Sequence, residues 1–127
     1  MGNRNSIVVH ERSYYTGEEL TPLYLYSHWH GQELDKVVSD ALQKGRTNDP
    51  AYFTRILISE MVKDDINGST GFGISQQEQD HDSYNHMLHI KWDRNNSSKI
   101  YIERDEERFS KDDFINAVSI WYAEVAK

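Results

Sequence analysis

The sequence predicts an α+β domain in which a five-stranded, mostly antiparallel sheet carries three packed helices. The predicted strands are grouped along the chain, in the order ββααβββα, and they do not alternate one by one with helices. That order argues against βαβ units and a parallel, doubly wound sheet. The 127 residues contain no internal repeat and no linker, so residues 1–127 are expected to form a single domain.

The first two predicted strands come before any helix. Ser6–His10 is a short β-branched run, and Leu23–His28 is a second extended run beyond a loop with glycine and proline. We expect the two to pair antiparallel. Within the second strand, one face would carry Tyr24, Tyr26 and His28, because side chains alternate along a strand.

Three apolar stripes predict helices. The first helix has apolar residues at helical spacing and ends at Gly45, and the second begins with Asp49 as N-cap and a proline at its first position. The last helix begins at Ser110, which is followed three residues later by an acid in a capping-box-like pattern. The stripe of the first helix consists of Leu34, Val37, Val38, Ala41 and Leu42.

Three further strands are predicted in the second half of the chain. Thr70–Ser75 contains two glycines, and His86–Trp92 and Lys99–Glu103 form a hairpin. The stretch RDEERFSKDD that follows is rich in acids, and we expect a solvated connector and the start of the last helix.

Composition limits the classes of partner. The chain has 21 acidic and 14 basic residues and a net charge of −7, which repels phosphate backbones, so no nucleic-acid partner is expected. Without cysteine, neither disulfides nor thiolate metal ligands are available. No apolar run approaches the length of a membrane-spanning helix, so no membrane partner is expected.

The stretch SHWHG at the end of the second strand is the strongest candidate site. His28 and His30 would leave the same face of a continuing strand, as a shared metal requires. The further ligands that such a site needs could come from His81, Asp82, His86 or His89. Because no HExxH or second compact ligand pair accompanies them, we expect no metal there.

The same stretch is also the entrance to the first helix. An anion could bind the unpaired amides there, with His28 or His30 bonding to a phosphate and Trp29 stacking on a ring. In the alternative, Trp29 is a core residue beneath the helix. The sequence leaves both interpretations open.

Two arginines and a phenylalanine extend this candidate site. Arg46 follows the first helix, and Arg55 lies on an apolar helix, where it needs an internal carboxylate or a bound anion as partner. Phe72 stands between two glycines that mark a bulge or a close approach of backbone to another group. An internal salt bridge is the expected partner for Arg55, and a bound anion is the alternative.

Catalysis has little support in the sequence. No serine lies in a G-x-S-x-G pattern, and adjacent acids such as Asp64 and Asp65 should point apart instead of facing each other. The sequence therefore favours a binding protein without a cofactor over an enzyme.

The segments LYLYSHWHG, DPAYFTRILISEM and STGFGIS resemble those of a group of small uncharacterised proteins encoded by tailed bacteriophages. That group has a similar Y-x-Y-[ST]-H-W-x-G strand, an aspartate-led YxxRI helix and a TG-aromatic-GIS strand. The resemblance covers about residues 6 to 103 and transfers no catalytic residue. It implies a phage protein made in the bacterial host cytoplasm, where small accessory proteins often antagonise host defence.

Three functions are compatible with these features. The first is sequestration of a nucleotide-derived signal by a homo-oligomer, with the base on Trp29, Tyr26 or Phe72 and the phosphates at Arg46, Arg55 and the helix start. The second is a protein–protein antagonist of a host defence factor that binds through exposed aromatic residues, namely Tyr14, Tyr15 and Trp92. The third is a metal-dependent hydrolase that uses His28 and His30.

The first hypothesis depends on one spatial expectation. A protein that sequesters a small molecule needs a pocket that encloses most of its ligand. The hypothesis therefore requires one accessible cavity that is lined by Trp29, Arg55 and Phe72.

Overall fold

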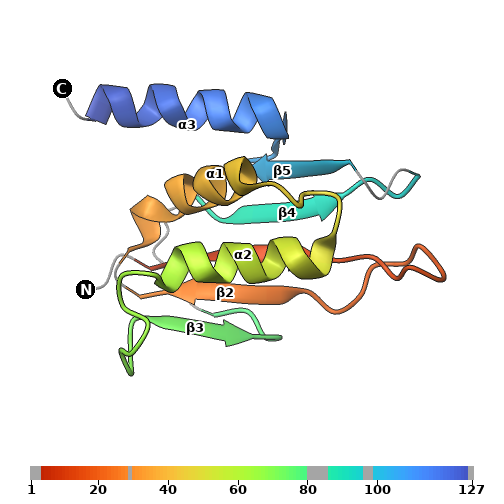
Figure 1. Ribbon diagram of the computed structural model, residues 1–127, viewed down its shortest axis with the longest axis horizontal. Helices are drawn as coiled ribbons and strands as arrows, with labels where there is room; N and C mark the ends of the chain where they lie inside the picture. The colour runs from red at the N-terminus through yellow and green to blue at the C-terminus, as the bar shows by residue number, and fades with distance from the viewer. Residues whose placement is uncertain (1–3, 29, 80–85, 96–98, 126–127) are drawn as a thin grey trace.

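The chain folds as a mixed sheet with three helices on one of its faces (Figure 1). The computed structural model describes residues 4–28, 30–79, 86–95 and 99–125. The sheet has six strands in the order β3-β2-β1-β4-β5-β6. The strands are β1 (Asn5–His10), β2 (Leu23–Ser27), β3 (Phe72–Ser75), β4 (Leu88–Trp92), β5 (Ile100–Arg104) and β6 (Glu107–Ser110).

The α+β class and the three helices are confirmed, but the prediction of five strands is wrong. The additional strand, β6, lies within RDEERFSKDD, which we had expected to be a connector. It follows β5 through a two-residue turn in which Asp105 and Glu106 have φ angles of 54° and 67°. Turns of this kind usually contain Asn-Gly or Asp-Gly, and Asp-Glu gives no such signal.

The strand pairing also differs in part from the prediction. The pairing of β1 with β2 is antiparallel, as expected, and so are the pairings β2–β3, β4–β5 and β5–β6. However, β1 and β4 are parallel neighbours. After β3 at one edge the chain returns past two strands before it forms β4, so no other strand of the described residues pairs with the second side of β3.

Three helix boundaries lie where local sequence signals predict them. They are η1 (Gly31–Glu33), a 3₁₀ turn, followed by α1 (Leu34–Lys44), α2 (Pro50–Val62) and α3 (Lys111–Val125). Gly45 ends α1 with a φ of 95°, Asp49 accepts a hydrogen bond from the Tyr52 amide, and Ser110 accepts one from the Asp113 amide. Each of these signals had been identified in the sequence.

Alternation along the strands separates a covered face from an open one. The covered face packs against the three helices and forms the core, in which four of the five stripe positions of α1, namely Leu34, Val38, Ala41 and Leu42, are buried and Val37 is partly buried. The strand residues of this core are Ile7, Val9, Leu25, Leu88, Ile90, Trp92, Ile100, Ile102 and Phe109. The open face carries Tyr24, Tyr26, His10, His89, Lys91 and Glu103, in register with the buried alternates.

The three aromatic residues proposed for a protein contact fall in two different environments. Tyr14 and Tyr15 project from the loop between β1 and β2, and their side chains are 94% and 91% exposed. Trp92 was expected at the surface, and that expectation is wrong because it is 1% exposed. Its Nε1 donates to the Thr47 carbonyl at 2.8 Å and its ring meets Phe53 edge-on, so its polar atom is satisfied inside the core.

None of the helices in the described part of the chain is long and apolar enough to cross a membrane.

Candidate functional site

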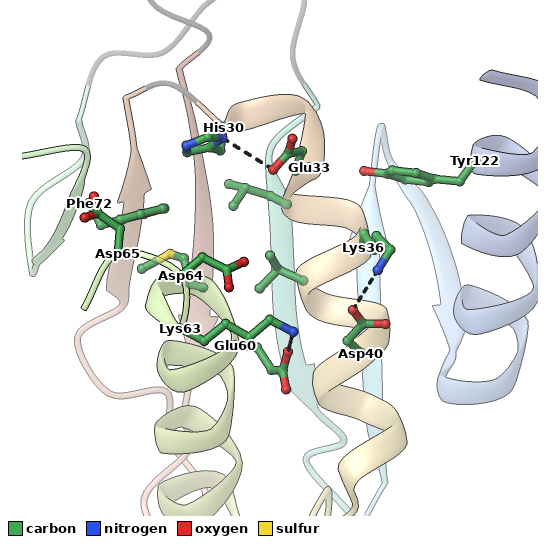
Figure 2. A pocket seen from close by; sticks show the side chains of 13 residues that line it. His30, Glu33, Lys36, Asp40, Glu60, Lys63, Asp64, Asp65, Phe72 and Tyr122 are labelled. Carbon is green, nitrogen blue, oxygen red and sulfur yellow. Dashed lines mark hydrogen bonds and ion pairs between the residues drawn. The ribbon is translucent and has the colours of Figure 1, made fainter. Parts of the chain in front are cut away.

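A cleft of about 630 Å³ opens between the beginning of α1, the end of α2 and the first residue of β3 (Figure 2). Its position follows from the connection between the helices. A short link after α1 turns the chain back, so α2 ends beside the place where α1 begins (Figure 1). The lining residues are His30, Glu33, Leu34, Lys36, Val37, Asp40, Glu60, Met61, Lys63, Asp64, Asp65, Phe72 and Tyr122.

One wall of the cleft is aromatic. The His30 and Phe72 rings stack, with centroids 5.8 Å apart and planes inclined by 15°. His30 is held at the start of η1, where its amide donates to the buried Ser27 hydroxyl at 3.0 Å. Its Nδ1 lies 3.4 Å from a Glu33 carboxylate oxygen. This wall therefore offers a flat, partly polar surface on which an apolar part of a ligand can pack.

Tyr122 of α3 closes another side of the cleft, and its hydroxyl points towards α1 (Figure 2). Burial raises the pKa of this phenol to about 12, and the nearby Asp35 carboxylate acts in the same direction. A hydrogen bond with the Lys36 backbone opposes the increase. Tyr122 is therefore a neutral wall of the cleft at physiological pH.

Carboxylates outnumber basic groups in the lining. Among the residues that the structure describes, the lining of the cleft has five carboxylates and two lysines, a net charge of −3 with His30 neutral. Lys36 pairs with Asp40 at 3.2 Å, and Lys63 pairs with Glu60 at 3.0 Å, so both lysines already have an anionic partner. Any anionic ligand would have to compete with these pairs.

Glu60 is the best enclosed of the cleft carboxylates, with a side chain that is 8% exposed. A hydrogen bond from Lys63 lowers its pKa, and Lys44, 3.3 Å away, acts in the same direction against the effect of burial. A carboxylate held ionised in this way is a weak general base, since an efficient base has a pKa near the operating pH.

The structure brings two of the predicted site residues together, His30 and Phe72, which form the aromatic wall. Tyr26 lies on the open face of the sheet, and its hydroxyl is 3.2 Å from Nδ1 of His28. These two side chains contact each other, and neither lines the cleft. Trp29 lies outside the described residues.

The two arginines are placed away from the cleft. Arg46 follows α1 with a φ of 61°, where its guanidinium lies 4.2 Å above the Tyr52 ring and 3.7 Å from Asp49. Arg55 is on the exposed side of α2, and no ion pair connects it to another described residue. Neither arginine lines the cleft that contains Phe72. The prediction that Arg55 and Phe72 share one phosphate-binding pocket is therefore wrong.

The histidines of SHWHG do not form the shared metal site considered above. His28 contacts Tyr26, whereas His30 stacks on Phe72. Within residues 4–28, 30–79, 86–95 and 99–125, no group of three or more His, Asp or Glu side chains is arranged to hold a metal ion. His81 and Asp82, two of the possible further ligands, lie outside these ranges.

The sequence analysis missed the charged residues of the cleft. Asp64 and Asp65 point apart, as expected, and both line the cleft, because the chain leaves the end of α2 in a turn (Figure 2). The acids and lysines come from η1, α1, α2 and the turn after α2, and no spacing in the sequence connects these segments.

A second polar cluster lies on the open face. His10 Nε2 and His89 Nδ1 are 2.9 Å apart, and the two rings stack. Burial lowers the pKa of both histidines. The charge of Lys91 acts in the same direction, and Glu103 opposes it. The alternation of β1 and β4 places both rings on the same face, because Val8, two residues before His10 and on the same face as it, pairs with His89.

The chain matches no protein-family model, no curated protein and no solved structure.

Proposed function

We propose that this protein is a non-catalytic binding protein whose cleft holds a positively charged ligand with an apolar stem. The observation that carries this proposal is the excess of three negative charges around a cleft of about 630 Å³. Opposite charges attract more strongly in a partly enclosed site than in water. The aromatic wall formed by His30 and Phe72 would cover the apolar part of the ligand, and cations are favoured near aromatic faces.

The charge of the cleft supports a cation better than the nucleotide-derived ligand expected from the sequence. A cyclic dinucleotide would place two phosphates near five carboxylates, and Lys36 and Lys63 would each have to leave an acidic partner. Sequestration without catalysis remains the proposed mode of action. In agreement with it, the hydrogen bond from Lys63 lowers the pKa of Glu60, so this carboxylate is a weak general base. The resemblance to small phage proteins supports an infected bacterial cell as the setting, where capture of a host molecule would counter a defence response.

Calorimetric titration tests the proposal, with spermidine as the cationic probe and a cyclic dinucleotide and ADP-ribose as anionic probes. We expect spermidine to bind and the anionic probes to give no heat. The double substitution Asp64→Asn and Asp65→Asn should weaken spermidine binding by about tenfold or more, since it removes two of the lining charges.

Asp112→Asn with Asp113→Asn is the matched control. It changes the net charge equally, but these acids lie in the exposed first turn of α3 and do not line the cleft. If both double variants weaken spermidine binding equally, the affinity depends on the overall charge of the protein, and the assignment of the ligand to the cleft is wrong. Binding of a nucleotide that depends on Lys36 and Lys63 would restore the original hypothesis.

A second candidate function is favoured by the loop between β1 and β2. Tyr14 and Tyr15 are almost fully exposed, and their rings pack edge-to-face with centroids 5.3 Å apart. The loop is internally bonded, since Ser13 donates to Glu18 and Arg12 donates to the Gly17 carbonyl. Exposed aromatic residues on an ordered tip are typical of contact hot spots.

We therefore propose, as the alternative, that this tip binds a host defence protein. Replacement of Tyr14 and Tyr15 by serine should abolish recovery of a specific host protein in a pull-down. Tyr52→Ser is the matched control, because Tyr52 is also exposed but lies on α2. Equal recovery with the loop variant and the control would refute a role for the tip.

A further inference from the structure

The two edges of the sheet differ in how they are protected. Natural sheets usually guard an edge strand with charges, prolines or a covering element. The edge strand β6 carries Glu107 and Arg108, and α3 packs beside it. The other edge strand, β3, contains neither a charged residue nor a proline, and its Ile74 side chain is 55% exposed.

The pairing of β3 with β2 shows which of its backbone groups remain free. The His28 amide donates to the Gly71 carbonyl at 2.8 Å, and Tyr26 is the partner of Gly73. In an antiparallel ladder, residues bonded to the neighbour alternate with residues whose N–H and C=O point the other way. Gly71 and Gly73 therefore bond to β2, and Phe72 and Ile74 direct their backbone groups outward.

The open edge and the cleft are continuous. Phe72 is the first residue of β3, and its side chain lines the cleft (Figure 2). Asp65, in the turn that precedes β3, also lines the cleft. A strand added to β3 would thus pass the mouth of an acidic cavity.

We propose that the β3 edge and the acidic cleft together bind an extended, basic segment of a partner protein, which adds to the sheet as a further strand. This inference rests on the proposed function, because it names the cationic group as a lysine or arginine side chain. Backbone hydrogen bonds to Phe72 and Ile74 hold the segment, and alternate side chains select it, as in other cases of strand addition.

The charges and the side-chain alternation define the segment. Residues directly opposite Phe72 and Ile74 share the covered face of the sheet, so their side chains are directed to the side of the cleft. Lysine fits these positions because its stem can pack on Phe72 while its ammonium reaches the carboxylates. The intervening residues lie on the other face, over Gly73 and Ser75, where β-branched side chains have room.

A second copy of this chain fits the edge less well. Antiparallel pairing of two β3 strands would bring two clefts, each with a net charge of −3, to the same face of a continuous sheet. Each chain also carries a net charge of −7, so the two copies repel each other. Charge complementarity therefore favours a basic partner over a homodimer.

The experiment uses the full chain, the capped peptide Lys-Val-Lys-Val-Lys and its matched counterpart Glu-Val-Glu-Val-Glu in calorimetric titrations. We expect the lysine peptide to bind and the glutamate peptide to give no heat. Ile74→Pro should weaken binding of the lysine peptide by about tenfold, because the substitution removes an outward N–H of β3 without removing a hydrogen bond to β2. Ile74→Thr retains that N–H and should change the affinity less than about threefold.

Modified peptides repeat the test on the unaltered protein. N-methylation of the central lysine removes an N–H directed at β3, whereas N-methylation of a valine removes one directed at solvent. The first change should weaken binding by about tenfold and the second by less than about threefold. Equal effects of the two methylations would overturn the strand-addition geometry.

Spermidine separates failure of this inference from failure of the proposed function. If spermidine binds but Ile74→Pro and the methylated lysine leave peptide affinity unchanged, the cleft binds cations and the edge is not used. If neither spermidine nor the lysine peptide binds, both proposals are wrong. A dimer in size-exclusion chromatography that Ile74→Pro converts to a monomer would show that a second copy occupies the edge, and would overturn the inference.

Discussion

The strongest stability prediction concerns the ion pair that connects α1 to β5. Arg104 Nε and Nη2 donate to the two carboxylate oxygens of Asp35 at 3.1 and 3.3 Å, and its guanidinium lies 4.2 Å above the Trp121 ring. The Asp35 side chain is only 15% exposed. Because a buried charge depends on its partner, the two possible single substitutions should have unequal effects.

Arg104→Gln leaves the Asp35 carboxylate buried without its partner, which costs about 3–5 kcal/mol. Asp35→Asn leaves an arginine that still contacts Trp121 and lies 3.6 Å from Asp105, so the cost is about 1–2 kcal/mol. For a domain of this size, 1 kcal/mol corresponds to about 3–5 °C in Tm. We expect Tm to fall by about 9–25 °C for Arg104→Gln and by about 3–10 °C for Asp35→Asn.

The pH dependence of the two variants should differ in sign. Burial raises the pKa of Asp35 above 3.8 in spite of Arg104, so its contribution to stability is present below pH 3.8 and is lost as pH rises through the folded-state pKa. The cost of Asp35→Asn should therefore shrink from pH 4 to pH 7. The cost of Arg104→Gln should grow over the same range, because the unpaired carboxyl becomes charged.

Thermal unfolding followed by circular dichroism measures both effects. Arg108→Gln is the control, because Arg108 is exposed, stacks on Tyr101 and has a weak ion pair with Asp93, so its loss should cost less than about 1 kcal/mol. Equal costs for Asp35→Asn and Arg104→Gln, or the same pH trend in both, would refute the argument from buried charge.

Three further predictions concern the rest of the fold. Burial lowers the pKa of His10 and His89 below 6.5, so their contribution to stability is present above pH 6.5 and is lost as pH falls through the folded-state values. Tm should decline on acidification from pH 7.5 to 5.5, and replacement of both histidines by glutamine should flatten that decline. Glu106→Gly should raise the free energy of unfolding in urea by about 1 kcal/mol, since glycine adopts the φ of 67° without strain; a lower urea midpoint would contradict this. Trp92→Phe should cost about 2–4 kcal/mol, because it leaves the Thr47 carbonyl unpaired and opens a small cavity in the core, and an unchanged Tm would disprove that role.

Signals contained in a few adjacent residues predicted local structure well. Each of the three helix-boundary signals acts over three or four residues, and the structure confirms all three. They are the N-cap Asp49, the glycine that ends α1, Gly45, and the N-cap Ser110. The strand β6 was missed because its turn places Asp105 and Glu106 in a conformation that sequence patterns assign to glycine or asparagine. The error thus arose where the backbone departs from the preferences of its residues.

Tertiary contacts were not predictable in the same way. The aromatic wall joins His30 and Phe72, which are far apart in the sequence, and nothing in either motif indicates that they stack. Arg55 was expected to form an internal salt bridge because its helix is largely apolar, and that prediction is wrong, since Arg55 is exposed and has no ion pair with another described residue. Periodicity identifies the buried stripe of a helix, and it does not identify the residues that flank an opening at its end.

The cleft and the open edge have the same cause in the topology of the sheet. After β3 the chain does not add its next strand to that edge, and β4 instead pairs in parallel with β1 at the centre. No strand in the described part of the chain therefore pairs with the outward backbone groups of β3. The turn that leads into β3 stays beside the end of α2, where it contributes Asp64 and Asp65 to the cleft. Had β4 paired with β3, the edge would be closed and a strand could no longer be added next to the acidic cavity. One crossover connection thus places an uncharged strand edge directly beside a strongly charged cleft. An ordinary acidic surface has no such edge, so the proposed binding of a basic strand depends on both features together.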